Sequence, residues 1–102
     1  MPDFLSHNAN AILTAMKAYI LYNKGSSHER LAEDFAGRLE REQVEVELVD
    51  ADSERGSWMA ETYDIMGRPA VLLVREDGSP MQVWQGVDGL PLVTEVAYLA
   101  HS

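Results

Sequence analysis

The chain has 102 residues, of which 46% are hydrophobic, so it is long enough to bury one core and we expect a single domain over residues 1–102. Its formal net charge is −9, from 17 acidic and 8 basic side chains, which disfavours nucleic acid and anionic membranes as partners. It contains no cysteine, which excludes disulfides, thiolate metal sites and thiol redox chemistry.

The first residues carry no pattern for export or membrane insertion. The N-terminus lacks a basic region, and the apolar run 11–13 is too short for a signal peptide. No run approaches the roughly 20 apolar residues of a membrane-spanning helix. We expect a cytoplasmic protein, a monomer, with a loose terminus at residues 1–7 and a core over about residues 17–101. The histidines are too far apart in sequence for metal-ligand spacing, so we predict no metal site: His7, His28 and His101.

The first half of the chain alternates helix and strand patterns. Apolar residues at helical spacing predict a short helix over 9–16. The aromatic-rich run 18–22 is typical of a buried strand, and residues 23–26 after it have the composition of a loop. Strict alternation over 44–48 predicts a second strand with one acidic face, which suits the edge of a sheet.

A helix is predicted between these two strands. Ser26 and Glu29 have the spacing of a capping box, which indicates that the helix begins there and runs to about Glu42. Apolar residues recur every four positions along it and should face a core: Leu31, Phe35 and Leu39. The outer face carries two oppositely charged pairs at i,i+4 spacing: Arg30 with Asp34, and Asp34 with Arg38.

A third helix is predicted after the acidic strand. Ser53 or Ser57 can cap its N-terminus. Large residues then follow at spacings of three or four and are predicted to face a core: Trp58, Met59, Thr62, Tyr63 and Met66.

The next segment has the pattern of a hairpin. Pro69 suits the first position of a strand, because it has no N–H and a fixed φ, and the apolar run 70–74 follows it. Asp77-Gly78 is a strong turn signal, and a strand should return over 81–85. A loop at 86–89 and a helix containing residues 92–100 follow. After the extra helix over 9–16, the predicted order is therefore β-α-β-α-β-β-α. The first two strands should be parallel, and the hairpin should add antiparallel strands.

This order resembles the thioredoxin superfamily over residues 17–101. The run from Tyr63 to Val74 is similar to the family's sequence of aromatic, x, apolar, x, Gly, x, Pro and strand, and Gly86 falls where the family has a glycine after its last strand. The resemblance implies an α/β, thioredoxin-like three-layer fold, a mixed four-stranded sheet with helices on both faces. It also implies a cis bond between Arg68 and Pro69, which X-Pro pairs adopt in only about 5–6% of cases.

The family's redox cysteines are absent from their usual place. Residues 21–27 resemble the glutaredoxin sequence that leads into the nucleophilic cysteine, and Ser27-His28-Glu29-Arg30 then replaces Cys-x-x-Cys. A serine hydroxyl does not ionise usefully at a helix N-terminus, and arginine cannot resolve a disulfide. The buried carboxylate of thioredoxin aligns with Leu21, and the family tryptophan aligns with Ser26. We therefore expect no thiol–disulfide oxidoreductase activity and assign no catalytic residue.

The candidate binding surface lies around Pro69 and the start of the helix near Ser27. In the family the backbone before cis-proline pairs with an extended peptide, so our first hypothesis is a non-redox adaptor or chaperone that binds a partner polypeptide there, without a cofactor. Three basic residues should converge beside the helix N-terminus, which favours an anion. The candidate binding residues are Lys24, Ser27, His28, Arg30, Arg68, Pro69 and Asp88.

Two alternatives stay open at these residues. In glutaredoxins a lysine at the position of Lys24 binds a glutathione carboxylate, and residues 86–90 are similar to their glutathione loop, with Gly89 in place of an aspartate. The resemblance therefore allows a glutathione-binding or glutathione-transferase-like protein that uses Lys24, Arg68 and Asp88. The second alternative is that the basic side chains are solvated or paired within the chain, and that Ser27 only caps its helix.

Overall fold

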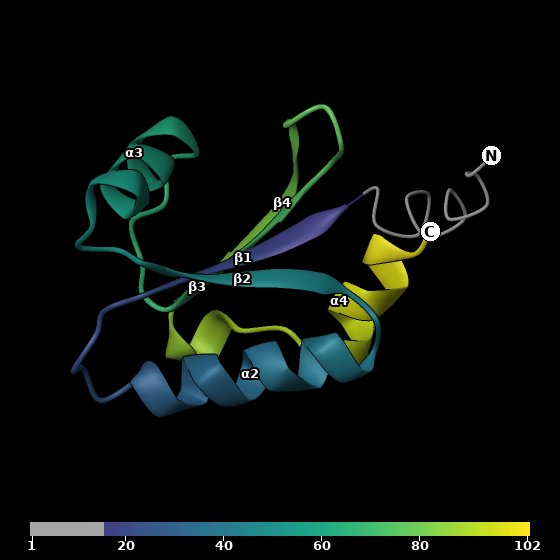
Figure 1. Cartoon of the computed structure of the whole chain (residues 1–102), viewed down its shortest axis with the longest axis horizontal. Coiled ribbons are helices and arrows are strands. Elements are labelled where there is room, and N and C mark those ends of the chain that lie inside the picture. Colours follow the sequence, from purple (N-terminus) through teal and green to yellow (C-terminus); the bar gives the residue numbers. More distant parts are fainter. Residues whose placement is uncertain (1–15) are drawn as a thin grey trace, which may run out of the picture.

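The computed structural model describes residues 16–102, which form a four-stranded mixed sheet in the order β2-β1-β3-β4 with helices on both faces (Figure 1). The strands are β1 (Lys17–Tyr22), β2 (Glu45–Asp50), β3 (Ala70–Val74) and β4 (Pro80–Gln85). The helices are α2 (Glu29–Arg41), α3 (Glu54–Thr62), the short 3₁₀ helix η1 (Val87–Gly89) and α4 (Val93–Ala100). The predicted terminus at 1–7 and helix at 9–16 lie outside the described residues, apart from Met16. The predicted order and three-layer α/β fold are otherwise confirmed.

Strand pairing defines the end of the sheet that carries the candidate site. β1 and β2 are parallel, as predicted, and β3 runs antiparallel to both β1 and β4. In this register Tyr22 pairs with Asp50, Leu21 pairs with Ala70, and Ala70 pairs with Gln85. The C-terminal ends of β1, β2 and β4 therefore lie beside the N-terminal end of β3. We call this edge, where β3 begins just after Pro69, the Pro69 end of the sheet.

One face of the sheet is covered by α2 and α4 (Figure 1). Leu39 of α2 and Val96 of α4 are fully buried against Ile20 and Val71 of the central strands. Burial of each such side chain stabilises the fold by about 1.5–3 kcal/mol. This face holds the larger of the two clusters of buried side chains and is the main core. The predicted apolar period of α2 is confirmed for its second half, whereas Leu31 in its first turn is 39% exposed.

The opposite face is covered by α3, whose rotation differs from the prediction. Met59 is buried as predicted, but Trp58 is 58% exposed and Met66 is 83% exposed. Gly56 sets this rotation: a Cβ there would lie 2.1 Å from the backbone oxygen of Asp50, so the helix packs directly on the β2 backbone through this glycine. The buried stripe therefore runs through positions 56 and 59, and the predicted core positions of Trp58, Thr62 and Met66 are wrong.

The caps and turns around α3 and the hairpin follow the sequence. Ser53 is the N-cap of α3, and its Oγ accepts a hydrogen bond from the backbone N–H of Gly56 at 3.0 Å. Gly78 has a φ of +89° in the predicted hairpin turn, and its carbonyl accepts a hydrogen bond from Tyr63 Oη at 3.1 Å. Tyr63 therefore joins the end of α3 to the hairpin.

Candidate functional site

The loop at residues 65–69, which we call the Pro69 loop, is attached to the end of β4. Gln85 Oε1 accepts hydrogen bonds from the backbone N–H groups of both Met66 and Gly67, each at 2.8 Å. The backbone N–H of Gly86 donates to the carbonyl of Pro69 at 2.9 Å. A Cβ on Gly67 would lie 3.1 Å from Gln85 Cβ, so only a glycine fits comfortably there. Gly67 and Gly86, the two glycines of the resemblance, thus keep the loop close to β4.

Arg68 lies at the centre of this loop, and its peptide bond to Pro69 is cis, as the resemblance predicts. Its Nη1 donates to the carbonyls of Ile65 at 3.3 Å and of Gly67 at 3.2 Å, and its Nε is buried without a partner in the described part of the chain. The guanidinium thus braces its own loop. The backbone N–H and C=O of Arg68 have no hydrogen-bond partner among residues 16–102. Its predicted role as an anion ligand stays a prediction.

The start of α2 differs from the predicted capping box. The helix begins at Glu29, the N-cap is His28, and no side chain bonds to the cap. Glu29 Oε1 accepts instead from the backbone N–H of Gly25 at 2.8 Å, while Ser26 Oγ is buried without a partner among the described residues. The reason is that residues 23–29 form two successive hydrogen-bonded turns before the helix, which moves its start past both serines. The predicted capping roles of Ser26 and Ser27 are therefore wrong.

His28 stabilises the same loop. Its Nε2 accepts a hydrogen bond from the backbone N–H of Asn23 at 3.0 Å, which ties the end of β1 to the start of α2. Ser27 beside it is exposed.

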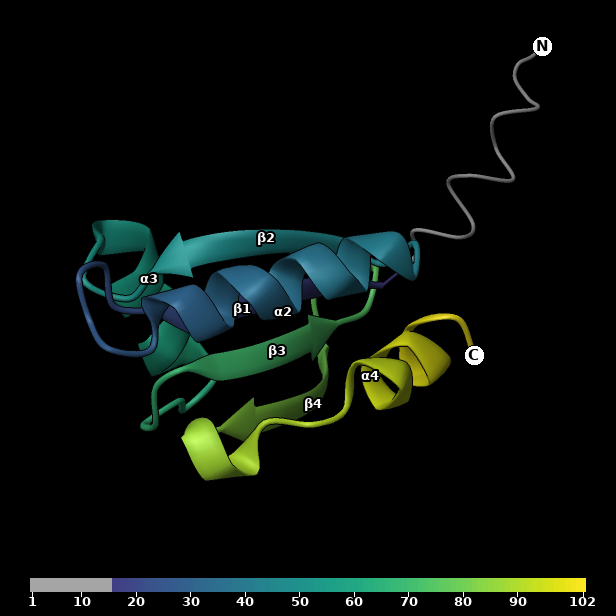
Figure 2. The same ribbon diagram turned by 90° about the horizontal axis from the view of Figure 1, so that it is seen from below.

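The structure brings the segments of the candidate basic residues to one end of the molecule. Lys24 in the β1–α2 loop, Arg30 in the first turn of α2 and the Pro69 loop all lie at the Pro69 end of the sheet, and η1 with exposed Asp88 follows β4 there (Figure 2). Lys24 and Arg30 are exposed and form no ion pair with residues 16–102. The predicted pairs of Asp34 with Arg30 and Arg38 are absent, as expected where solvent screening offsets the attraction between exposed side chains. A shared anion site of these side chains stays a prediction.

Sequence reasoning missed three residues at this end of the sheet. Met66 in the Pro69 loop is 83% exposed, and Val87 in η1 is 56% exposed. Gln85, which is hydrogen-bonded to the N–H of Met66, lies between them. Gly67 directly after Met66 was the available signal, because a helix does not extend its buried stripe through a breaker. Nothing in the sequence distinguishes Gln85 from other polar strand residues.

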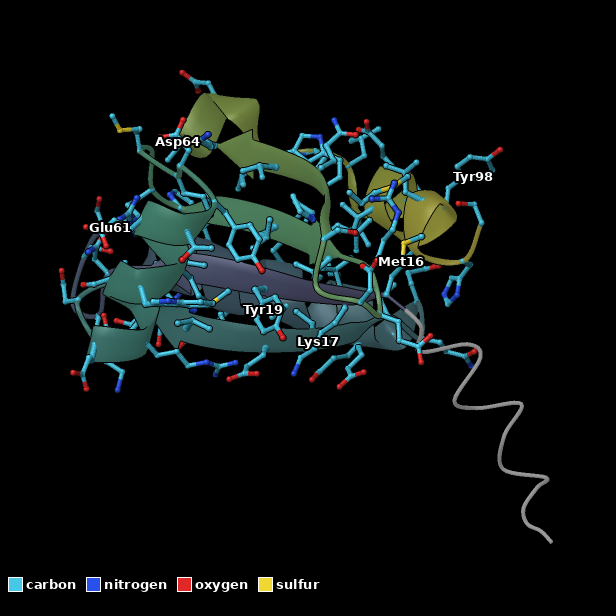
Figure 3. The ribbon with its side chains drawn as sticks, turned by 90° about the horizontal axis from the view of Figure 1, so that it is seen from above. Met16, Lys17, Tyr19, Glu61, Asp64 and Tyr98 are labelled. Carbon is cyan, nitrogen blue, oxygen red and sulfur yellow. The ribbon has the colours of Figure 1, made fainter. Side chains whose placement is uncertain are left out.

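A groove of about 340 Å³ runs between the C-terminal half of α3 and the Pro69 loop. We call it the α3 groove. Ala60, Ile65 and Met66 provide its apolar lining, and Glu61 and Asp64 provide carboxylates (Figure 3). The remaining contributors are Ser57 and Arg68. Arg68, whose backbone groups have no described partner, is therefore one of the residues that line this groove.

A separate charged cluster lies on the α3 side of β1 and β2. Glu47 accepts hydrogen bonds from Arg55 and, at 3.0 Å, from Lys17 Nζ. Both cations lie over the ring of Tyr19, with Lys17 Nζ 4.9 Å from the ring centroid. The hydrogen bonds from Arg55 and then Lys17 lower the pKa of Glu47 below its usual value, and the bond to Glu47 raises the pKa of Lys17. This cluster joins β1, β2 and α3.

Metal and membrane features can be assessed only for residues 16–102. Within them no three histidine or acidic side chains gather as metal ligands. None of the helices that the structure describes is long and apolar enough to cross a membrane.

Comparison with known proteins supports the fold. No family model and no curated protein sequence matches the chain. Among solved structures, a point mutant of thioredoxin from Halobacterium salinarum is 16% identical, with a TM-score of 0.67 over 98% of this chain and 84% of that one. Oxidised thioredoxin from Plasmodium falciparum is 12% identical, with a TM-score of 0.66 over 95% and 93% of the two chains. The zinc-bound form of human ERp44 is 20% identical, with a TM-score of 0.60 over 93% of this chain and 28% of that one.

These likenesses and the sheet order define the class of the protein, an α/β protein with a thioredoxin-like fold. This chain is a form of that fold without any cysteine, in which Ser27 and Arg30 stand at the positions that the resemblance assigns to the redox pair.

Proposed function

We propose that this chain is a non-redox binding module, an adaptor or chaperone, that binds an extended segment of a partner polypeptide at the Pro69 end of the sheet. The observation that carries the proposal is the 83% exposure of Met66 beside the backbone N–H and C=O of Arg68, which have no partner among the described residues. An extended segment can pair with these two backbone groups, as in strand addition to a sheet. Met66 and Val87 then supply apolar contact on either side.

The Pro69 loop has the fixed geometry that such binding needs. Gln85 holds the N–H groups of Met66 and Gly67, and the Arg68 guanidinium holds two of the loop's carbonyls. A loop that is already ordered loses less conformational entropy when a partner binds. The arrangement therefore supports recognition of a partner segment by a preformed surface.

The test uses exposed apolar residues at the two ends of the molecule. The chain is incubated with an array of 15-residue peptides, and affinities of bound peptides are then measured by fluorescence anisotropy. Met66→Ser should weaken binding about tenfold, because an apolar contact at the centre of an interface contributes on the order of 1–2 kcal/mol. Tyr98→Ser is the matched control: Tyr98 is 75% exposed on α4 and lies away from Asp64 and the α3 groove (Figure 3).

Since both side chains are exposed, neither variant should change the melting temperature. Failure of every peptide to bind would refute the proposal. Equal losses of affinity in the two variants would place binding elsewhere.

The glutathione alternative is separated from peptide binding by a titration. Glutathione is added to the ¹⁵N-labelled chain, and amide shifts are followed at Lys24, Ser27 and Asp88. We expect no saturable change at these residues. Saturable shifts there, reduced in Lys24→Ala, would favour a glutathione-binding protein instead.

A further inference from the structure

Two acidic side chains stand at the C-terminal end of α3, where the helix itself disfavours them. Glu61 is in the last turn of α3 and Asp64 follows two residues after the helix ends. The C-terminus of a helix carries a partial negative charge of about −0.5, and an acidic side chain there is destabilising. The last turn holds no basic residue, and neither carboxylate forms an ion pair within residues 16–102. Asp64 has a φ of +57°, a conformation that aspartate adopts more readily than most residues, but this backbone preference does not require its negative charge or that of Glu61.

Both carboxylates line the α3 groove together with apolar Ala60, Ile65 and Met66. Ile65 is 4% exposed and forms a buried part of the groove, while Met66 is 83% exposed to solvent. The one cation of the groove is Arg68, and its Nη1 is directed to the carbonyls of Ile65 and Gly67. The groove therefore presents an apolar surface next to two carboxylates that form no ion pair with residues 16–102, and with Arg68 included its side chains carry a net negative charge.

We infer that this groove selects the partner, and that the bound segment carries a lysine or arginine beside a large apolar residue. The inference rests on the proposed function, because the groove adjoins the same Pro69 loop. Basic side chains match such a groove in both parts: the methylene stem packs on Ala60 and Met66, and the charged end reaches Glu61 and Asp64. The net charge of −9 also attracts a cationic segment from a distance.

An acidic segment in the α3 groove is disfavoured by the same geometry. It would meet Glu61, Asp64 and the negative end of the α3 dipole together. Lys24 precedes α2 and Arg30 lies in its first turn, and neither of them lines this groove. Charge at the α3 groove therefore favours a cationic partner.

The test compares three fluorescent peptides that share length and apolar residues and differ at two positions, which are both lysine, both glutamine or both glutamate. Anisotropy with the full chain is measured at low and at high salt. The lysine peptide should bind about tenfold more tightly than the glutamine peptide at low salt, because two exposed ion pairs each add a modest attraction. High salt should remove most of this advantage.

Two double variants test whether the carboxylates of the α3 groove cause the preference for the lysine peptide. Glu61→Gln with Asp64→Asn should abolish the advantage of the lysine peptide over the glutamine peptide. The control, Glu33→Gln with Glu40→Gln, makes the same change in net charge on exposed positions of α2 and should keep the advantage.

The outcomes separate this inference from the proposed function. Equal binding of the lysine and glutamine peptides, with both weakened by Met66→Ser, would overturn the inference and leave the proposed function standing. Tighter binding of the glutamate peptide would also overturn it. Equal losses in the two double variants would mean that net charge alone attracts the peptide, and the α3 groove would not be the site. If none of the peptides binds, the inference and the proposed function fail together.

Discussion

Gln85 connects β4 to the Pro69 loop through a single side-chain oxygen. Because this oxygen accepts from both Met66 and Gly67, Gln85→Ala removes two hydrogen bonds at once. The freed N–H groups are exposed and water can replace the lost partner, so we expect a loss of only about 1 kcal/mol of unfolding free energy. Amide hydrogen exchange at Met66 and Gly67 should become faster than in the parent chain.

The matched control for that prediction is Gln82→Ala. Gln82 is an exposed glutamine of the same strand with no hydrogen bond to the loop. It should leave exchange at Met66 unchanged. Unchanged exchange in Gln85→Ala as well would show that the loop does not depend on this contact.

Glu47 makes the stability of the protein depend on pH. Its pKa in the folded chain lies below the ordinary value of 4.5, because Arg55 and Lys17 stabilise the carboxylate. Its contribution is therefore complete above the pKa of the unfolded chain and is lost as pH falls through the lower folded pKa. The side chain is 33% exposed, so solvent screening limits this contribution to at most about 1 kcal/mol.

Urea unfolding of Glu47→Gln at several pH values tests this linkage. The variant should be less stable than the parent at pH 7, and the difference should shrink below about pH 4.5. Glu33→Gln, at an exposed position outside these ion pairs, should show no such trend. A constant difference at all pH values would contradict the assigned role of Glu47.

At the scale of elements, replacing Gly56 of α3 or Gly37 of α2 with alanine should change the stability in opposite directions. A Cβ at Gly56 would lie 2.1 Å from the carbonyl oxygen of Asp50 and 2.8 Å from Ala51 Cα, and both are backbone atoms that cannot rotate away. Gly56→Ala should therefore force α3 off β2 and destabilise the fold by about 2 kcal/mol, which outweighs the gain of about 1 kcal/mol in helix propensity.

Gly37→Ala in α2 is the control, because nothing lies within 4 Å of its added Cβ. There only the helix propensity changes, and we expect a gain of up to about 1 kcal/mol. Thermal unfolding should show melting temperatures shifted in opposite directions, by several degrees in each case. A stabilised Gly56→Ala would mean that α3 does not pack on the backbone of β2 as described.

The same glycine explains what the sequence could predict about α3 and what it could not. Spacings of three and four predict a helix with an apolar stripe, but Trp58 and Met59 are adjacent and point about 100° apart, so they cannot both face the core. Hydrophobicity favours Trp58 at least as strongly as Met59. The choice is made by the close approach of Gly56 to the β2 backbone, a tertiary contact that no local pattern contains.

The start of α2 shows a similar limit. The apolar period correctly predicts that a helix covers this face of the sheet. The capping box is wrong because the preceding loop closes two turns of its own and brings Glu29 to Gly25 in place of Ser26. A capping-box sequence therefore predicts the N-cap only when the preceding loop leads directly into the helix at that residue.

At the scale of the whole molecule, the order of elements and the Gly-Arg-Pro sequence before β3 were enough to predict the fold and the bond at Pro69. They were not enough to predict the surface. Exposure of Met66 and the α3 groove depend on where α3 stops and how Gln85 holds the loop, and both follow from contacts between segments distant in sequence. The sequence therefore predicted the fold around Pro69, whereas the surface of the candidate site depends on packing between distant segments.

The absence of cysteine leads to a prediction for the whole chain. Reduction of a disulfide by this fold needs an attacking thiolate, and none of the 102 residues provides one. Ser27 and Arg30 cannot form a mixed disulfide at the start of α2, however well a substrate pairs with the Pro69 loop. In an insulin-reduction assay with dithiothreitol, the chain should add no turnover above a heat-killed control, whereas a thioredoxin with both cysteines accelerates the reaction. A rate that rises in proportion to the concentration of the folded chain would contradict a purely binding role.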